Sequence, residues 1–185
     1  MRYRLKRHPD AVCAAVADIE VDVVRPDANT LLLCYAAAGN IGDMLLPAGT
    51  ARGRADELWR HTCFEAFVRS SLDGGYYELN FAPSTEWAAY QFDGYRAGMR
   101  VATEIDTPKI EVKSAPERYV LQAALQLPKP FASSIWRLGL SAVIEEANGR
   151  KSYWALAHPH GKADFHHSDC FACELSPAWL DEIRH

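Results

Sequence analysis

The chain has 185 residues, of which 49 % are hydrophobic and 24 % charged, with a net charge of −4 at pH 7. These values predict a single globular domain spanning residues 1–185, with enough apolar side chains to bury a core. A dense basic surface is excluded, which argues against nucleic acid as the main partner. The longest apolar runs fall far short of the roughly 20 residues that span a bilayer, and the basic first residues lead into no signal-like stretch. We therefore expect a soluble, cytoplasmic protein without a membrane partner.

The cysteines are odd in number and lack the spacing of a disulfide framework, so we expect reduced thiols. Two of them form a single CxxC, whereas structural zinc sites need four ligands. The five cysteines are Cys13, Cys34, Cys63, Cys170 and Cys173.

Alternation of apolar and polar residues with a period of two is the regular signal along the chain and predicts half-buried strands. Turn residues separate the strands, and Asn148-Gly149 predicts a two-residue hairpin. Many short strands without alternating helices predict an all-β, antiparallel sandwich or barrel. In chain order, the predicted strands lie near 2–6, 18–24, 30–36, 58–69, 76–81, 87–93, 109–113, 120–127, 136–145 and 152–157.

One short helix is predicted at the end of the sequence. Ser176 suits the N-cap, Pro177 the first helical position, and Trp179 and Leu180 would dock the helix. A single helical turn near 9–15 is a further candidate.

The segment 57–67 concentrates residues that a plain strand does not need. As a strand it would place Trp59, His61 and Glu65 on one face, together with Cys63 and Phe67. A carboxylate on such a face is costly to bury unless it is paired or contacts a ligand. The alternative interpretation is an internal salt bridge between Glu65 and an arginine.

The segment 76–99 combines polar and aromatic residues. Alternation predicts that Glu78 and Asn80 face away from the core, close in sequence to Trp87. Carboxylate and amide groups bind sugar hydroxyls, and aromatic rings stack on sugar C–H surfaces. The alternative is that Trp87 is an ordinary core residue and that Glu78 pairs with Arg96.

The segment 152–171 is rich in histidine. Imidazole and carboxylate groups are ligands of transition metals, but these residues lack the i, i+4 spacing of zinc enzymes. Ligand contacts or hydrogen bonds that close the loop are the favoured interpretation, with a metal as the alternative. The residues concerned are His158, His160, Asp164, His166, His167 and Asp169.

No nucleophile elbow, phosphate-binding loop, dinucleotide fingerprint or zinc-protease motif is present in the sequence. We therefore assign no catalytic residue. The pair Glu65 and Glu78 could form the two carboxyl groups of a glycosidase, so a hydrolase stays an alternative.

Taken together, three segments resemble the DOMON-like bacterial domains, relatives of the family-9 carbohydrate-binding modules. They are LWRHTCFEAFV at 58–68, YYELNFAPSTEWAAYQFDGYRAGM at 76–99 and SYWALAHPHGKADFHHSDCF at 152–171. The resemblance implies a two-sheet β-sandwich with a cleft for a small molecule or saccharide, often held between two tryptophans. It makes Trp87 and Trp154 the stacking candidates.

The resulting ligand-binding set combines the stacking candidates with the polar residues above. It comprises Trp59, His61, Glu65, Glu78, Asn80, Trp87, Arg96, Trp154, His158, Asp164 and His166. We expect no resident cofactor and no metal. Because some DOMON relatives bind haem through Met and His, Met44 or Met99 with a histidine of 158–167 is the haem alternative. A structural role, in which exposed aromatic residues form a dimer interface, is a further alternative.

Overall fold

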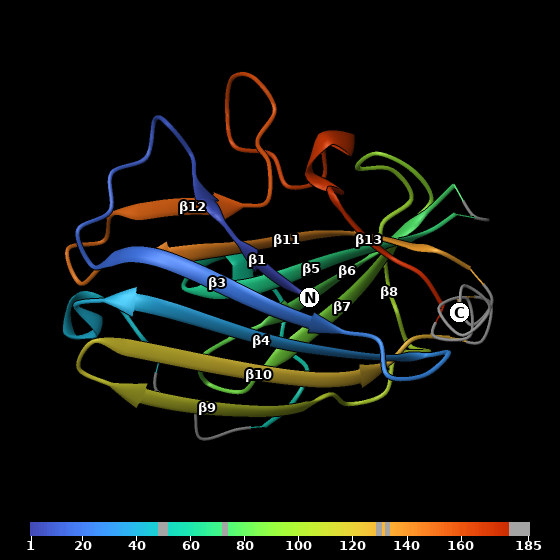
Figure 1. Cartoon of the computed structure of the whole chain (residues 1–185), viewed down its shortest axis with the longest axis horizontal. Helices are drawn as coiled ribbons and strands as arrows, with labels where there is room; N and C mark the ends of the chain where they lie inside the picture. The colour runs from blue at the N-terminus through green and yellow to red at the C-terminus, as the bar shows by residue number, and fades with distance from the viewer. Residues whose placement is uncertain (48–51, 72–73, 129–130, 132–133, 178–185) are drawn as a thin grey trace.

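The computed structural model describes residues 1–47, 52–71, 74–128, 131 and 134–177. Within them the chain forms two antiparallel β-sheets, of five and eight strands, stacked face to face (Figure 1). The all-β, two-sheet sandwich is therefore confirmed. Among these residues, no helix is long and apolar enough to cross a membrane.

The five-stranded sheet, called sheet A, has the order β1-β3-β4-β10-β9. Its two central pairings, β3 with β4 and β4 with β10, are long and antiparallel. The strands are β1 (Arg2–Arg4), β3 (Val16–Val24), β4 (Thr30–Gly39), β9 (Lys109–Ala115) and β10 (Arg118–Gln126).

The eight-stranded sheet, called sheet B, has the order β2-β12-β11-β5-β6-β7-β8, and β13 pairs with β11 as well. Its middle strands β11, β5 and β6 come from distant parts of the sequence. The strands are β2 (Lys6–Arg7), β5 (Cys63–Ser70), β6 (Tyr76–Phe81), β7 (Trp87–Phe92), β8 (Arg100–Val101), β11 (Trp136–Glu145), β12 (Lys151–Ala155) and β13 (Cys173–Leu175).

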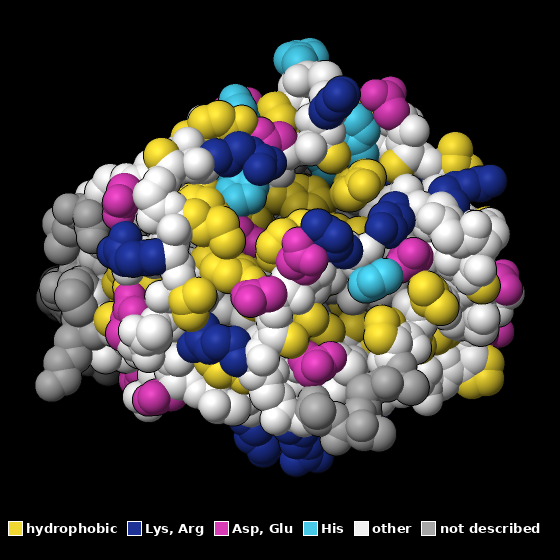
Figure 2. Space-filling model, turned by 180° about the vertical axis from the view of Figure 1, so that it is seen from behind, with side chains coloured by type: hydrophobic (Ala, Val, Ile, Leu, Met, Phe, Trp, Pro, Cys, Tyr) yellow, Lys and Arg dark blue, Asp and Glu magenta, His cyan; other side chains and the backbone are white. Residues whose placement is uncertain are grey.

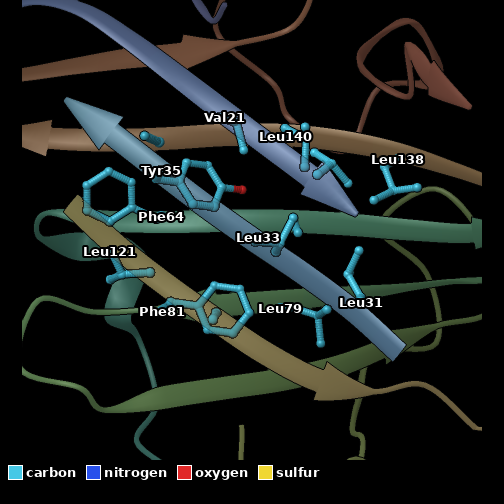
Figure 3. Packing of buried hydrophobic residues seen from close by; sticks show 14 of the residues in the cluster. Val21, Leu31, Leu33, Tyr35, Phe64, Leu79, Phe81, Leu121, Leu138 and Leu140 are labelled. Atoms are coloured by element: carbon cyan, nitrogen blue, oxygen red, sulfur yellow. The ribbon is translucent and has the colours of Figure 1, made fainter. Parts of the chain in front are cut away.

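The main core lies between the two sheets and follows the predicted alternation. Leu121 of β10 and Leu140 of β11 are at most 1 % exposed, and Leu79 of β6 points to the same interior (Figure 3). The Tyr35 hydroxyl crosses this core and donates to the Glu65 backbone oxygen at 2.6 Å. Sheet A is thereby hydrogen-bonded to the middle of sheet B.

The outer face of sheet B is also covered by other parts of the chain, although the alternating sequence pattern predicted strands with one face in solvent. A second apolar cluster there joins Phe67, Tyr76 and Tyr90 to Phe165 and Phe171. The last two belong to residues 156–171, called here the closing loop. Gly139 of β11 permits this packing, because a Cβ atom there would lie 3.2 Å from the Cys170 backbone oxygen.

Three sequence predictions need correction. Residues 58–60 form a 3-10 turn, η2 (Leu58–Arg60), so β5 begins only at Cys63. The β11–β12 hairpin exists, but residues 146–150 connect it instead of two residues, with Gly149 at φ +80°. Residues 9–15 contain turns and bends without a helix.

The predicted C-terminal helix lies outside the described residues beyond Pro177, and Ser176 and Pro177 themselves are not helical. Two further 3-10 turns are η1 (Ile41–Asp43) and η4 (Ser168–Cys170).

The interior packing predicts a large cost for shortening a core side chain. Leu121→Ala should lower the free energy of unfolding by about 2–5 kcal/mol, because it removes buried apolar volume between the sheets. Val24→Ala, at a side chain that is 46 % exposed, should change it by less than about 1 kcal/mol. Urea unfolding measures both. Equal effects of the two substitutions would contradict the placement of Leu121.

Candidate functional site

A pocket of about 460 Å³ opens on the outer face of sheet B. Its base, called here the floor, consists of Glu65, Phe67, Glu78 and Val143 from β5, β6 and β11. Figure 2 views the molecule from this side and shows hydrophobic side chains in a hollow bordered by charged and histidine side chains. The walls are Trp59, Phe92, Arg96, Met99, Tyr153, Ala163, Phe165 and His166.

Strand register brings the two acidic side chains of the floor together. Glu65 pairs with Asn80, and Phe67 pairs with Glu78, across the β5–β6 ladder. Because alternate residues of a strand share a face, Glu65 and Glu78 are diagonal neighbours on the outer face of sheet B. The sequence prediction that Glu78 and Asn80 face away from the main core is confirmed.

Glu65 is a buried carboxyl group without a salt bridge among the described residues. It is 2 % exposed, and its Oε1 has no hydrogen-bond partner in that part of the chain. Burial, and then the neighbouring Glu78 carboxylate, raise the pKa of Glu65 well above its usual range. The salt bridge to an arginine considered from the sequence is absent here. A lone carboxyl group that lines a pocket and lacks a partner marks a candidate binding site.

Glu78 is held by an amide and faces a histidine. Asn80 Nδ2 donates to Glu78 Oε1 at 2.8 Å, and His166 Nε2 lies 3.6 Å from Glu78 Oε2. Burial is the main cause that raises the pKa of Glu78. Both carboxyl groups of the floor therefore favour the protonated form more than an exposed glutamate does.

His166 of the closing loop lies over the floor as a neutral imidazole. Its Nδ1 is 2.7 Å from Tyr76 Oη, and its ring packs 5.0 Å from the Phe67 ring. Tyr76 Oη also accepts from Arg96 N, so the tyrosine proton is available for His166 Nδ1. The ring proton then sits on Nε2, facing Glu78. Burial, and then the Arg96 charge, lower the pKa of His166 to about 4.

Arg96 and Asp164 join two loops at the edge of the pocket. Arg96 Nη2 lies 2.8 Å from Asp164 Oδ1, which also accepts from His166 N at 3.1 Å. The Tyr95 hydroxyl donates to the other Asp164 oxygen. Arg96 adopts the left-handed conformation at φ +51°, which is uncommon for a residue with a side chain. The loop between β7 and β8 is thus tied to the closing loop, and the positive charge of Arg96 is matched by Asp164.

Aromatic side chains flank the floor on two sides. Tyr153 of β12 is 36 % exposed, and Trp59 of η2 is 37 % exposed. The Trp59 ring lies 6.0 Å from the Tyr90 ring of β7, edge to face. Since β12 and β7 lie on opposite sides of β11, β5 and β6, Trp59 and Tyr153 border the pocket from opposite sides.

The prediction that Trp87 and Trp154 stack on a ligand is wrong. Trp87 and Trp154 are 4 % and 3 % exposed and belong to the main core between the sheets. Register explains this: Trp87 pairs with Phe81, and Trp154 pairs with Ala142, both of which face the interior. Neither indole ring can stack on a ligand in the pocket.

Two predicted histidines also lie outside the pocket wall. His61 Nδ1 contacts Glu145 Oε2 at 2.7 Å, and His158 Nε2 contacts the Lys6 backbone oxygen at 2.8 Å. His158 therefore has the loop-closing role that the sequence allowed. Seven residues of the predicted set do lie at the site. Five line the pocket: Trp59, Glu65, Glu78, Arg96 and His166. Two more, Asn80 and Asp164, are bonded to lining residues.

The residues proposed for metal or haem binding do not come together as ligands. Over the described ranges, no group of three His, Cys, Asp or Glu side chains is arranged to hold a metal ion. Met44 is buried in the main core, and His166 Nε2 faces Glu78. Met99 does line the pocket. His166 lines it too, but its two ring nitrogens face Tyr76 Oη and Glu78 Oε2, so the described geometry gives the haem alternative no open histidine ligand there.

Several pocket residues were not singled out from the sequence. Phe92, Val143, Tyr153 and Phe165 all line the pocket. For Tyr153 a signal existed, since it alternates with Trp154 and therefore shares a face with Val143, its partner across the β11–β12 ladder. For Phe165 no periodic signal exists, because it lies in a loop.

Comparison with known proteins adds information on the fold. No known family model matches the chain, and no curated protein is similar to it in sequence. A proposed carbohydrate-binding protein from Bacteroides uniformis ATCC 8492 has a TM-score of 0.61 at 11 % identity, covering 91 % of this chain and 83 % of that one. A family-9 carbohydrate-binding module from Caldicellulosiruptor kristjanssonii, in complex with cellotriose, has a TM-score of 0.54 at 14 % identity, covering 87 % and 74 %. The chain therefore has the fold of these proteins, and the relation to DOMON-like domains stays a prediction.

The buried carboxyl group predicts an unusual pH dependence of stability. The pKa of Glu65 is higher in the folded than in the unfolded protein, so wild-type stability falls as pH rises above about 4.5. Glu65→Gln removes this loss. The Tm of Glu65→Gln minus that of the wild type should therefore increase from pH 4.5 to pH 8 by several degrees, at roughly 2–4 °C per kcal/mol.

The matched control is Glu117→Gln, at an exposed side chain in the turn between β9 and β10. Its Tm difference from the wild type should stay constant over the same pH range. A flat difference for Glu65→Gln as well would show that the Glu65 carboxyl group is not buried in the folded protein.

Proposed function

We propose that the protein is a non-catalytic saccharide-binding module whose ligand occupies the pocket on the outer face of sheet B. The observation that carries this proposal is the combination of buried carboxyl groups on the floor with accessible aromatic rings on two sides. A volume of about 460 Å³ lies within the range of small-ligand sites, about 300–1,000 Å³.

The chemistry of the pocket suits a sugar unit. Glu65 Oε1 has no partner within hydrogen-bond distance in the described residues, although the Ser141 hydroxyl lies beside the Glu65 carboxyl group, and a hydroxyl group of a bound sugar would supply a further donor. Trp59 and Tyr153 offer aromatic surface for sugar C–H groups. These two residues take the stacking role first assigned to Trp87 and Trp154.

The site is rigid, so a ligand can bind without a large rearrangement of the protein. The floor consists of strand residues, and the Arg96–Asp164 pair fixes the loops that form the edge. A preformed site loses less entropy on binding than a flexible one. The shared fold with a module crystallised in complex with cellotriose supports a saccharide as the ligand class.

The hydrolase alternative is less well supported by the geometry. A glycosidase places its two carboxyl groups on either side of the scissile bond. Glu65 and Glu78 instead lie next to each other on one floor, on adjacent strands. Both would contact the same side of a bound sugar.

Removing the aromatic wall tests the proposal. Trp59→Ala should weaken the binding of cellotriose or glucose at least about tenfold, equivalent to ~1.4 kcal/mol, because stacking surface is lost. Tyr153→Ala should act in the same direction. Titration calorimetry measures the dissociation constants.

Val112→Ala, at an exposed apolar side chain of sheet A, serves as the control and should bind like the wild type. If Trp59→Ala and Tyr153→Ala both keep full affinity, the ligand does not occupy this pocket. If no mono- or oligosaccharide binds the wild type, the proposed function is wrong.

A further inference from the structure

The charges around the floor do not balance if both of its carboxyl groups are ionised. Glu65 and Glu78 contribute two negative charges. Two guanidinium groups lie on this face. That of Arg96 forms an ion pair with Asp164, and that of Arg69 on β5 lies over the Phe171 ring. His166 faces Glu78 but is neutral above pH about 4, where burial keeps its pKa. Within the described residues, therefore, neither Glu65 nor Glu78 forms a salt bridge with an arginine or a lysine.

The same floor also supplies few hydrogen-bond donors to its carboxyl groups, and the Ser141 hydroxyl of β11, opposite Glu65 in the strand register, is the donor beside Glu65. Glu65 is almost fully buried, lines the pocket, and has an Oε1 atom without a partner in the described structure. Glu78 has one donor in Asn80 Nδ2. A buried acceptor atom without a hydrogen-bond partner destabilises the protein, and a bound molecule that supplied a donor would recover this energy.

Aromatic rings border this acidic floor and strengthen the preference for a cation. Phe67 and Phe92 lie beside it, and Trp59, Tyr153 and Phe165 form the walls. A cation over the face of an aromatic ring is attracted to the ring electrons, and the attraction is stronger when the cation is removed from water. A floor with carboxyl groups and walls with aromatic rings together form an environment that suits an ammonium group.

We propose that the saccharide bound in this pocket carries a protonated amino group, which donates to Glu65 and Glu78 on the floor. This inference rests on the proposed function and adds that the ligand is positively charged. A neutral hydroxyl group would donate to Glu65 but would leave the pair without a counter-ion. An ammonium group has three donors and one positive charge, so it satisfies both needs.

Binding of the ammonium group then changes the number of protons held by the Glu65–Glu78 pair. In the free protein burial raises the pKa of both carboxyl groups, so the Glu65–Glu78 pair keeps a proton to higher pH than exposed glutamates do. The arriving ammonium group favours two carboxylates, so that proton leaves to the solvent while the amine keeps its own. The titratable and charged groups around the pair are Cys63 and Arg69 of β5, Tyr76 of β6, Tyr90 of β7, Tyr153 of β12, and Arg96, Asp164 and His166 of the loops.

The experiment compares three sugars that differ at one position. Glucosamine carries an ammonium group, glucose a hydroxyl group and N-acetylglucosamine an uncharged amide. Titration calorimetry near pH 6.5, in two buffers of different ionisation enthalpy, gives each affinity and the number of protons released. We expect glucosamine to bind at least about tenfold more tightly than the other two, with proton release for glucosamine alone.

Two variants connect this preference to the floor. Glu65→Gln keeps the shape of the side chain but removes its charge, so the affinities for glucosamine and glucose should converge. Glu117→Gln, at the exposed residue in the β9–β10 turn, should keep the full preference. Circular dichroism confirms that both variants are folded.

Each outcome has one meaning. If the three sugars bind equally, or if Glu65→Gln keeps the full glucosamine preference, the inference is wrong while the proposed function stands. If none of the sugars binds but cyclohexylamine does, the pocket accepts an amine without a saccharide, and the proposed function is wrong. If neither sugars nor cyclohexylamine bind, both proposals fail.

Discussion

The burial of the Glu65 carboxyl group on the outer face of sheet B is the constraint around which this site is organised. The sheet is covered on that face by the closing loop, so its outward side chains are removed from water. On the other face, Tyr35 donates across the core to the Glu65 backbone oxygen. The strand is thereby fixed from the interior, and its carboxyl group cannot turn away to solvent without disrupting the sandwich. A protein that retains such a group pays a stability penalty, which suggests that the group has a role in binding.

The pocket walls depend on contacts between segments far apart in the sequence. Asp164 joins the closing loop to Arg96 of the β7–β8 loop, and the same carboxylate accepts from the His166 backbone. His166 in turn reaches Tyr76 and faces Glu78. These contacts form a continuous connection from the pocket edge to the floor. The loops therefore act as fixed walls over a rigid sheet, as expected for a preformed binding site.

Much of the fold could be predicted from the sequence because strand alternation is a local signal. It correctly placed Leu79 and Leu140 in the core and turned Glu78 and Asn80 away from it. Alternation within one strand does not show which of two aromatic neighbours faces the pocket. That choice between Tyr153 and Trp154 follows from pairing with β11.

The remainder of the site could not be read from the sequence for a different reason. Trp59 was assigned to a strand, yet it reaches the pocket from a 3-10 turn whose geometry depends on its packing against Tyr90. The pairing of Arg96 with Asp164 joins two irregular loops, which carry no periodic pattern. The covering of sheet B by the closing loop depends on Gly139, whose lack of a Cβ atom matters only once the loop approaches it.

The most direct test is the titration of the glutamate carboxyl groups by carbon-13 NMR, with Glu65→Gln and Glu78→Gln used for assignment. The account predicts that in the free protein the Glu65 signal titrates well above the usual range of glutamate and the Glu78 signal titrates above it, and that saturating glucosamine shifts both titrations to lower pH. Ordinary titration of both residues in the free protein, unaffected by any sugar, would contradict it.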